Sequence, residues 1–368
     1  MPGEHTVCVS AVGDISFADS AYCVGHGLRS IIERTGQEVF EARLRSLLEE
    51  ADVRFGNLEA VHSDRGRHPL VLASVEMRGN PRHLSLLAAG GFNVVNVANN
   101  HIFQHGIDAY RDTVSRLEEM GVAVVGDQAA GRSRVASLEV RGVPVHFVGF
   151  SLRPEQYYPK AATPYATLQR SEIVRRVVGI RKELQGHLVC SLHWGHEYLD
   201  TASRQQQEFA RALIDAGVKL VLGHHPHVLQ GIERYRHGLI AYSLGNFAFD
   251  LRAEAARDTA CLYVDLDEAG VAGWHIQPLR LSDDGWPERC GAKESDRIRA
   301  KVEELSARLG GPLPEEAALA VQERARLRQR SRWTHRYFLR NLSRYSVLVA
   351  TQSVGRAALR RMGVLRNP

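Results

Sequence analysis

The sequence predicts an α/β fold in which two β-sheets pack face to face between layers of helices, followed by a basic helical extension. Strand-like apolar runs alternate with helix-like segments up to residue 223, and strand-like runs then follow one another with little helix between them. Alternation is typical of a parallel sheet, and consecutive strands are typical of an antiparallel one. Because the composition then turns basic, we assign residues 1–285 to the α/β domain and residues 286–368 to the extension.

The first half of the chain supplies short β-branched or apolar runs separated by amphipathic segments. Pro81 suits the first turn of a helix, where its missing N–H is not needed, and Gly121 is a common stop signal after a helix. The expected strands are 6–12, 53–57, 92–98 and 143–150, and the expected helices are 39–50, 81–89 and 107–120.

The second half continues the alternation and then loses its helices. We expect helices at 171–184 and 203–216, and strands at 188–193, 218–223, 228–235, 239–244, 260–266 and 271–281. The turn-forming cluster Ser282-Asp283-Asp284-Gly285 then marks the end of the domain.

Composition places the chain among ordinary globular proteins. With 368 residues, 44% of them hydrophobic and 24% charged, it is neither disordered nor of low complexity. Its five cysteines show neither zinc-ribbon nor redox spacing, which favours a reducing compartment. We find no signal peptide and no run of membrane-spanning length, so we expect a cytoplasmic protein that is at most peripheral at a membrane.

The extension differs in charge from the rest of the chain. It holds 18 of the 47 Lys and Arg residues but 8 of the 42 Asp and Glu residues, so it carries +10 and residues 1–285 carry −5. From Arg324 onward there are 12 arginines and no acid, interleaved with Trp, Tyr and Leu. We expect this segment to contact an anionic membrane surface or a membrane synthase. It could also simply pack on the acidic domain. Nucleic acid is a weaker candidate because no nucleic-acid module is visible.

Polar residues able to bind metal follow the predicted strands. In open α/β folds the carboxyl ends of strands line the ligand site, so residues placed there converge in space. The residues at these strand ends are Asp14, Asn57, Glu59, Asn99, Asn100, His101, His193, Glu197, His224, His225 and His227.

This mixture of side chains suits a divalent cation. A hydrolase that works near neutral pH needs an activated water, and a bound divalent ion lowers the pKa of water to about 7. Two ions roughly 3.5–4 Å apart need a bridging carboxylate, and imidazoles and an amide oxygen complete their shells without excess negative charge. The candidate ligands are Asp14, Glu59, Asn100, His193, His225 and His227.

Each candidate also has an ordinary structural explanation. Asp14 beside Gly13 could form a turn, and the Asn99 segment could cap a helix. His193 could be a core histidine, and Glu59 a solvated carboxylate. The pair around Pro226 favours a ligand role more strongly, because proline fixes the backbone beside a very apolar strand.

Five strings resemble the CapA family of poly-γ-glutamate capsule synthesis proteins. They are GDISFAD (13–19), FGNLEA (55–60), NVANNHIFQHG (96–106), SLHWGHEY (191–198) and LGHHPHVLQGIERYRHGLIAYSLGNFAFD (222–250). The resemblance covers residues 6–285, in order, and implies a calcineurin-like metallophosphoesterase fold: a two-sheet αββα sandwich with one or two divalent ions (Mn, Fe or Zn).

The resemblance also implies roles for individual residues. Asp14 matches the first metal-binding Asp, and Glu59 stands where a bridging acid is expected. Asn100 and His193 match metal ligands, as do His225 and His227 of the final His-x-His. His101 matches the general acid. Glu197 is a further candidate catalytic residue, and the residues expected to contact substrate or support the ligands are Asn57, Asn99, His224, Glu233 and Asn246.

One position departs from the superfamily pattern and another from the family pattern. Ser16, as in CapA motifs generally, stands where the superfamily has a histidine, which removes one ligand of the first metal. Gln104 replaces an aspartate that follows the Asn-His pair, which removes a supporting carboxylate.

Two functional hypotheses follow. The first is a metal-dependent hydrolase or transferase linked to capsule or exopolymer synthesis, which cleaves a phosphoester, ester or amide bond in an anionic polymer or phosphoester substrate. The second, motivated by Ser16, is a polymer-binding or synthase-accessory protein that keeps the fold without the chemistry.

Overall fold

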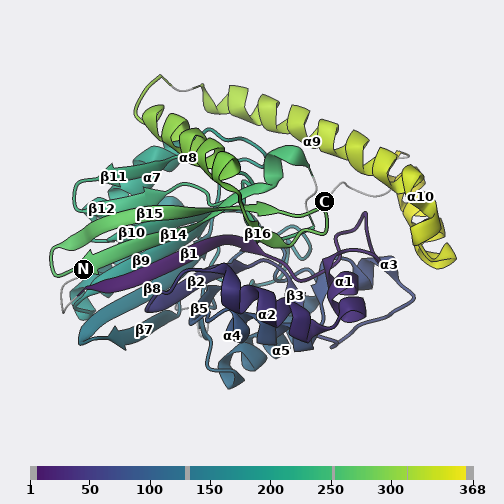
Figure 1. Ribbon diagram of the computed structural model, residues 1–368, viewed down its shortest axis with the longest axis horizontal. Helices are drawn as coiled ribbons and strands as arrows, with labels where there is room; N and C mark the ends of the chain where they lie inside the picture. Colours follow the sequence, from purple (N-terminus) through teal and green to yellow (C-terminus); the bar gives the residue numbers. More distant parts are fainter. Residues whose placement is uncertain (1–5, 129–132, 251–252, 313, 362–368) are drawn as a thin grey trace.

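The computed structural model describes residues 6–128, 133–250, 253–312 and 314–361. Two sheets lie face to face with helices on both outer faces (Figure 1), which confirms the predicted two-sheet α/β class. In spatial order, the first sheet contains β16 (Pro287–Arg289), β15 (Gly270–Leu281), β14 (Asp258–Asp267), β1 (Val7–Ile15), β2 (Val53–Leu58), β5 (Val94–Asn96) and β6 (Ala123–Val125), and β13 (Asn246–Ala248) pairs with β1. The second contains β11 (Ile232–Tyr235), β12 (Gly238–Ala241), β10 (Leu220–His224), β9 (His187–His193), β8 (Val143–Ser151) and β7 (Val135–Val140). Separately, β3 (Val61–His62) pairs with β4 (Arg78–Gly79).

Helices cover the outer face of each sheet with their apolar sides. Those packed on the first sheet are α1 (Leu28–Thr35), α2 (Gln37–Leu47), α4 (Ser85–Ala89) and α5 (Gly106–Glu119), and those packed on the second are α6 (Arg170–Glu183) and α7 (Arg204–Asp215). Shorter elements are α3 (Leu72–Val75) and the 3-10 turns Pro81–Leu84, Glu254–Ala256 and Leu342–Arg344. The chain then continues into α8 (Ala292–Ala307), α9 (Glu316–Arg340) and α10 (Val347–Arg361).

The alternation of side chains along each strand builds three hydrophobic layers. Val7 and Val9 of β1 and Val189 of β9 lie in the core between the sheets. Their strand neighbours point the other way: Leu188 and Cys190 pack under the helices of the second sheet. This is the period of two that a pleated strand imposes, and it explains why strands buried on both faces form nearly continuous apolar runs.

Several predicted elements differ in extent from the observed ones. Pro81 begins a 3-10 turn, and the α-helical geometry starts only at Ser85. The strand expected at 228–235 is limited to β11, because residues 226–231 form a loop at the edge of the sandwich. Helix α1 was not predicted, because its N-cap is Gly27 and no side chain caps its first turn.

The compositional break at residue 285 lies within the packed body. Beyond it, β16 pairs with β15, and α8 buries Ile298 and Val302 in the core between the sheets. Helix α9 then runs along one side of the body and α10 lies at its end (Figure 1). None of the described helices combines the length and the apolarity needed to cross a membrane.

Gly223 tests how tightly the second sheet is packed beside the histidines. It lies in β10 one residue before His224, and a Cβ there would come within 1.9 Å of the carbonyl oxygen of Tyr242. We expect Gly223→Ala to lower the free energy of unfolding by about 1–3 kcal/mol, because the backbone must shift. The control is Gly179→Ala in α6, where a Cβ meets nothing within 4 Å. This change should raise stability by about 0.5–1 kcal/mol. Urea titrations that place both variants at the same midpoint would contradict this account.

Candidate metal centre

The carboxyl ends of strands from both sheets meet at one edge of the sandwich. In the first sheet, Asp14 of β1 lies in register with Asn57 of β2 and with Asn246 of β13. In the second sheet, His193 ends β9 in register with His224, the end of β10. The topology therefore gathers polar residues that are far apart in the sequence.

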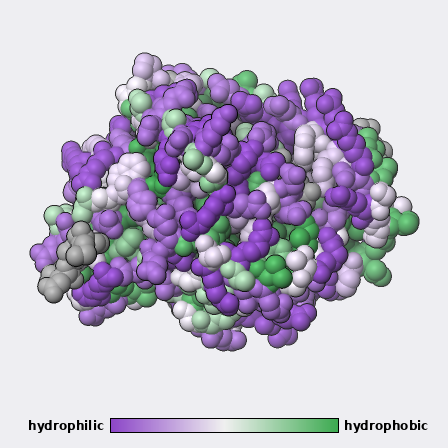
Figure 2. Space-filling view, viewed as in Figure 1, coloured by the Kyte–Doolittle hydropathy of each residue, from purple (hydrophilic) through white to green (hydrophobic). Residues whose placement is uncertain are grey.

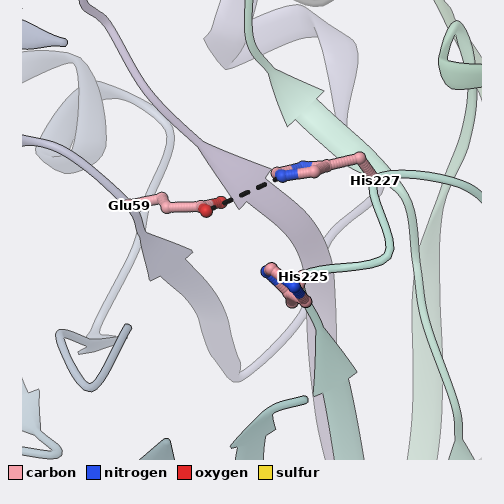
Figure 3. A group of neighbouring side chains, drawn as sticks. All are labelled: Glu59, His225 and His227. Carbon is pink, nitrogen blue, oxygen red and sulfur yellow. Dashed lines mark ion pairs between the residues drawn. The ribbon is translucent and has the colours of Figure 1, made fainter. Parts of the chain in front are cut away.

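Two groups of possible metal ligands form at this edge, which we call the metal cluster. One contains Asp14, Glu59 and His193, and the other contains Glu59, His225 and His227. The ligating atoms of each group lie within 4.8 Å of one another. Glu59, which directly follows β2, belongs to both groups. Figure 3 shows its carboxylate pointing toward His225 and His227, which come from the loop after β10.

The loop that carries these two histidines has an unusual backbone. His225 has φ of +95° and His227 has φ of +58°. Non-glycine residues rarely adopt positive φ, which costs of order 1–3 kcal/mol per residue and is concentrated at functional sites. The N–H of His225 donates to Asp14 Oδ2 at 3.1 Å, which fixes the loop against β1. With this backbone conformation, a ring nitrogen of each histidine lies within 4.8 Å of a carboxylate oxygen of Glu59.

Asp14 is fully buried and surrounded by donors. Asn57 Nδ2 donates to its Oδ1 at 2.8 Å, and the Nδ1 atoms of His224 and His227 each lie 3.3 Å from its carboxylate. Burial opposes ionisation, but the interactions with the two histidines outweigh it and hold the pKa of Asp14 well below its usual range. These interactions therefore favour the charged carboxylate form of Asp14 in the interior.

The side chains of Glu59 and His225 are buried without hydrogen-bond partners in the part of the chain that the structure describes. Neither oxygen of Glu59 and neither ring nitrogen of His225 has a hydrogen-bond partner among the described residues. Burial, and then the charge of Asp14, raise the pKa of Glu59 well above its ordinary value, and burial lowers the pKa of His225 well below. Unpartnered polar groups are costly in a dry interior. A divalent cation would satisfy both side chains, so the residues present fit such an ion.

His227 carries a proton in the metal-free cluster. Burial favours its neutral form, but the negative charges of Glu59 and Asp14 outweigh burial and raise the pKa of His227 to about 9. Its Nδ1 lies 2.8 Å from Oδ1 of Asn246, whose Nδ2 donates to the carbonyl of His227. Asn246 thus orients this ligand. The imidazolium supplies part of the positive charge that a cation would bring.

His193 is held by the predicted amide ligand. Its Nε2 lies 2.7 Å from Asn100 Oδ1 and 3.6 Å from Glu59 Oε1. Burial lowers the pKa of His193 well below its ordinary value, so the ring is neutral. A neutral imidazole and an amide oxygen are both suitable metal donors.

The neighbouring asparagines position the loops. Asn99 Oδ1 accepts from the N–H groups of His101 and Ile102, and its Nδ2 donates to the carbonyl of Leu58 at 2.8 Å. Asn96, which the sequence reasoning did not single out, donates to Asn57 Oδ1 at 2.9 Å. The only available signal was its place in the NVANNH string.

His101 lies at the margin of the metal cluster and is only partly buried. Its Nδ1 lies 3.0 Å from Gln104 Oε1 and 3.1 Å from the hydroxyl of Tyr157. Gln104, the departure from the family pattern, therefore still orients this ring. Burial lowers the pKa of His101. Nothing in the sequence pointed to Tyr157.

Three other positions complete the comparison with the sequence. Glu233 lies on β11 away from the metal cluster, where its carboxylate accepts from Arg211 at 2.7 and 2.9 Å and from Tyr242 at 2.7 Å. Ser16 is buried, with a hydroxyl that has no partner among the described residues. Glu197 follows β9, and its Oε2 lies 3.4 Å from Nη1 of Arg330 in α9. The extension therefore reaches the loop that follows β9, at the margin of the metal cluster.

The fold and its buried carboxylate–histidine cluster define an α/β sandwich protein with a candidate divalent-metal centre. The family model described as "Bacterial capsule synthesis protein PGA_cap" matches residues 8–251. The chain belongs to this family, and the predicted CapA relationship is confirmed.

Two relatives similar in sequence agree with this assignment. The PGA biosynthesis protein CapA of Bacillus subtilis (strain 168) is 26% identical over 284 residues, covering 76% of this chain and 73% of the relative. The capsule biosynthesis protein CapA of Bacillus anthracis is 26% identical over 307 residues, covering 80% and 72%. A solved structure of a hypothetical protein from Thermus thermophilus is similar at 13% identity with a TM-score of 0.47, covering 76% of this chain and 99% of that chain.

The raised pKa of His227 predicts a pH dependence of stability in the metal-free protein. A group whose pKa is higher in the folded state stabilises that state fully below its unfolded pKa, and this contribution is lost as the pH rises through its folded pKa. In the presence of a chelator, the free energy of unfolding should therefore fall between pH 6.5 and about 9. Urea titrations should show a smaller fall in His227→Gln. The control is His68→Gln, because His68 is exposed. Equal slopes in wild type and His227→Gln would refute the assignment.

Proposed function

We propose that this protein is a metal-dependent hydrolase or transferase that acts on a phosphoester, ester or amide bond of an anionic substrate in capsule-type polymer metabolism. The main support for this function is that Glu59 is shared by two groups of buried candidate ligands and lacks a hydrogen-bond partner among the described residues. A divalent cation held there would act as a Lewis acid that activates water and polarises the scissile group. Membership of the capsule synthesis family supports the substrate class.

The residues of the metal cluster and the amides beside them have different roles in such a site. Asp14 contributes a fixed negative charge, and Glu59 contributes a second carboxylate within reach of both groups. Asn57 and Asn246 hold Asp14 and His227 in place through bonds of 2.8 Å. This orientation by neighbouring amides preserves the ligand geometry while substrate is exchanged.

His101 is the residue suited to proton transfer. It lies beside the ligands and only partly buried, and its neutral form is favoured by the lowered pKa. A proton on Nδ1 directed at Gln104 leaves Nε2 as the atom that accepts a proton or delivers one to the leaving group. Positioned acid–base groups of this kind contribute about 10²–10⁴-fold to rate.

A second candidate is a polymer-binding or synthase-accessory protein without chemistry of its own. Two observations favour it. The metal cluster is closed, since Asp14, Glu59, His193 and His225 are fully buried. In addition, Ser16 offers a weaker ligand than the histidine of the superfamily pattern.

Metal content and turnover separate the two candidates. Elemental analysis of purified wild-type protein should find bound Mn, Fe or Zn, and Glu59→Gln and His225→Ala should lose it. His101→Gln should keep the metal but lose about 10²–10⁴-fold in turnover of an aryl phosphate ester, because the ligands stay and the proton-transfer group is gone. The exposed His68→Gln serves as the control and should match wild type in both assays. Bound metal with no turnover of phosphate, ester or amide substrates favours the accessory function, and absence of metal under all loading conditions rejects the hydrolase.

A further inference from the structure

Helix α9 is fastened to the loop that follows the metal-ligand strand β9. His196 in this loop lies between two acids of α9, with Nδ1 2.8 Å from Glu323 Oε2 and Nε2 2.9 Å from Glu316 Oε1. The N–H of Glu197 donates to Glu323 Oε1 at 2.8 Å. The basic extension is thus held against the margin of the metal cluster.

Arg330, seven residues beyond Glu323, places a guanidinium over this margin. Its Nη1 lies 3.4 Å from Glu197 Oε2, and its guanidinium carbon lies 5.5 Å from the centre of the Tyr198 ring. The contact with Glu197 is long, and a guanidinium has five N–H donors. With 36% of the side chain exposed, Arg330 keeps donors available to a ligand.

Tyr198 shows two signs of a functional role. Its backbone has φ of +61°, a costly value for a tyrosine. Its hydroxyl is buried and has no hydrogen-bond partner among the described residues, and the residue as a whole is 8% exposed. Its N–H donates to the carbonyl of Pro226 at 2.8 Å, and its ring centre lies 6.1 Å from that of His227. Tyr198 is therefore attached directly to the ligand loop.

Arg330 places its positive charge beside the ligand loop. Its guanidinium lies over the ring of Tyr198, whose N–H donates to the carbonyl of Pro226 between the two ligand histidines. A cation this close to the ligands can hold a negative group of a substrate while a neighbouring bond is cleaved. Guanidinium donors and a phenol hydroxyl are both suited to bind a carboxylate or phosphate oxygen.

We propose that Tyr198 and Arg330 form an oxyanion-binding subsite beside the metal cluster, contributed jointly by the ligand loop and the C-terminal extension. This inference rests on the proposed function for its catalytic meaning, since the subsite would hold an anionic group of the substrate. The bound chemistry is an oxyanion, which a carboxylated polymer or a phosphoester could each supply.

Calorimetric titration of the full-length protein with inorganic phosphate and with glutarate tests the subsite, with and without added Mn²⁺. Arg330→Gln should weaken binding of the preferred oxyanion by about tenfold, and Tyr198→Phe by about three- to tenfold. Arg330→Lys should recover part of the affinity. The control is Arg328→Gln, an exposed arginine on the same helix, and it should bind like wild type. Tighter binding of glutarate would indicate a carboxylated polymer as the natural ligand, and tighter binding of phosphate would indicate a phosphoester.

The outcomes separate this inference from the proposed function. Affinities for both oxyanions that are unchanged in Arg330→Gln, or equally weakened in Arg328→Gln, overturn the subsite, as does a wild type that binds neither oxyanion. Mn²⁺ binding measured in the same variants should be unchanged. If wild type binds no metal, the proposed function fails, while the phosphate titrations without metal still decide the subsite.

A different observation concerns the outer face of α10. Its inner face is bound to the body: Gln352 accepts from the N–H of Leu72 at 2.7 Å, and Arg356 pairs with Glu76 at 2.7 and 2.9 Å. Its outer face carries exposed apolar residues at helical spacing, with Val347 at 81% and Val354 at 58% exposure. The residues on this arc are Val347, Leu348, Thr351, Val354, Gly355, Ala358 and Leu359.

The surroundings of this outer face are apolar and basic. The exposed hydrophobic residues Leu339 and Leu342 precede α10 in the chain, and the carbonyl of the exposed Leu70 accepts from Gln352 on the inner face of α10. Hydrophobic residues gather at the edge of the molecule where α10 lies (Figure 2). Exposed arginines at 336, 340 and 344 precede it, and no acid occurs from 324 to 361.

We infer that the outer face of α10 docks on an anionic lipid surface, with Val347 and Val354 entering the interface and the arginines contacting headgroups. An exposed apolar stripe on a helix that follows a run of exposed arginines is typical of segments that bind a membrane interface. Each basic residue near an anionic surface adds an attraction that salt screens. The positive charge of residues 324–361 therefore favours an anionic surface over a neutral one.

Sedimentation with phosphatidylglycerol-containing vesicles tests this surface. Wild-type protein should bind them, release as salt is raised, and ignore pure phosphatidylcholine vesicles. Val354→Asp should weaken binding by about tenfold, whereas Val39→Asp, an exposed valine on α2, should bind like wild type. Wild type that stays in solution, or equal losses in both variants, would reject the inference. A dimer detected by light scattering and dissolved by Val354→Asp, without vesicle binding, would also reject it and assign the face to self-association.

Discussion

The repulsion between the buried carboxylates of Asp14 and Glu59 is the constraint around which the edge of the sandwich is arranged. Burial and the charge of Asp14 raise the pKa of Glu59 well above its ordinary value, so the repulsion is relieved when the cluster retains a proton. In the metal-free chain His227, whose pKa is raised to about 9, is a second group that favours its protonated form. Proton and cation therefore compete for one place, and the donors from Asn57, Asn246 and the N–H of His225 hold the ligands in position for either.

The hydrophobic cores of the sandwich offset the free-energy cost of the buried charges and the strained loops at this site. Continuous apolar cores lie between the sheets and under the helices on both outer faces. Phe55 stacks on Phe147 across the inner layer with ring centres 5.8 Å apart, which ties the two sheets together behind the ligands. The loops that join these strands can then hold His225, His227 and Tyr198 at positive φ, because the surrounding packing excludes other backbone conformations.

Much of this arrangement could be predicted from the sequence, and the failures have a common cause. The strand predicted at 143–150 is β8 (Val143–Ser151), and the placement of ligands at strand ends follows from the way α/β sheets are built. Tyr157, Tyr198 and Arg330 could not be predicted, because their importance arises from contacts between segments with no shared pattern. A basic helix has the same sequence pattern whether it is solvated or packed beside a metal cluster. Only the structure distinguishes these two environments.

The position of β1 in the first sheet has a consequence for how the chain is made. The strand pairs with β14 in antiparallel fashion, from Val7 opposite Leu266 to Ala11 opposite Leu262. A ribosome adding about 5–20 residues per second needs on the order of 10–50 s to produce that partner. During this interval one edge of β1 lacks its native partner, so the first sheet cannot be completed before about residue 266 has been made.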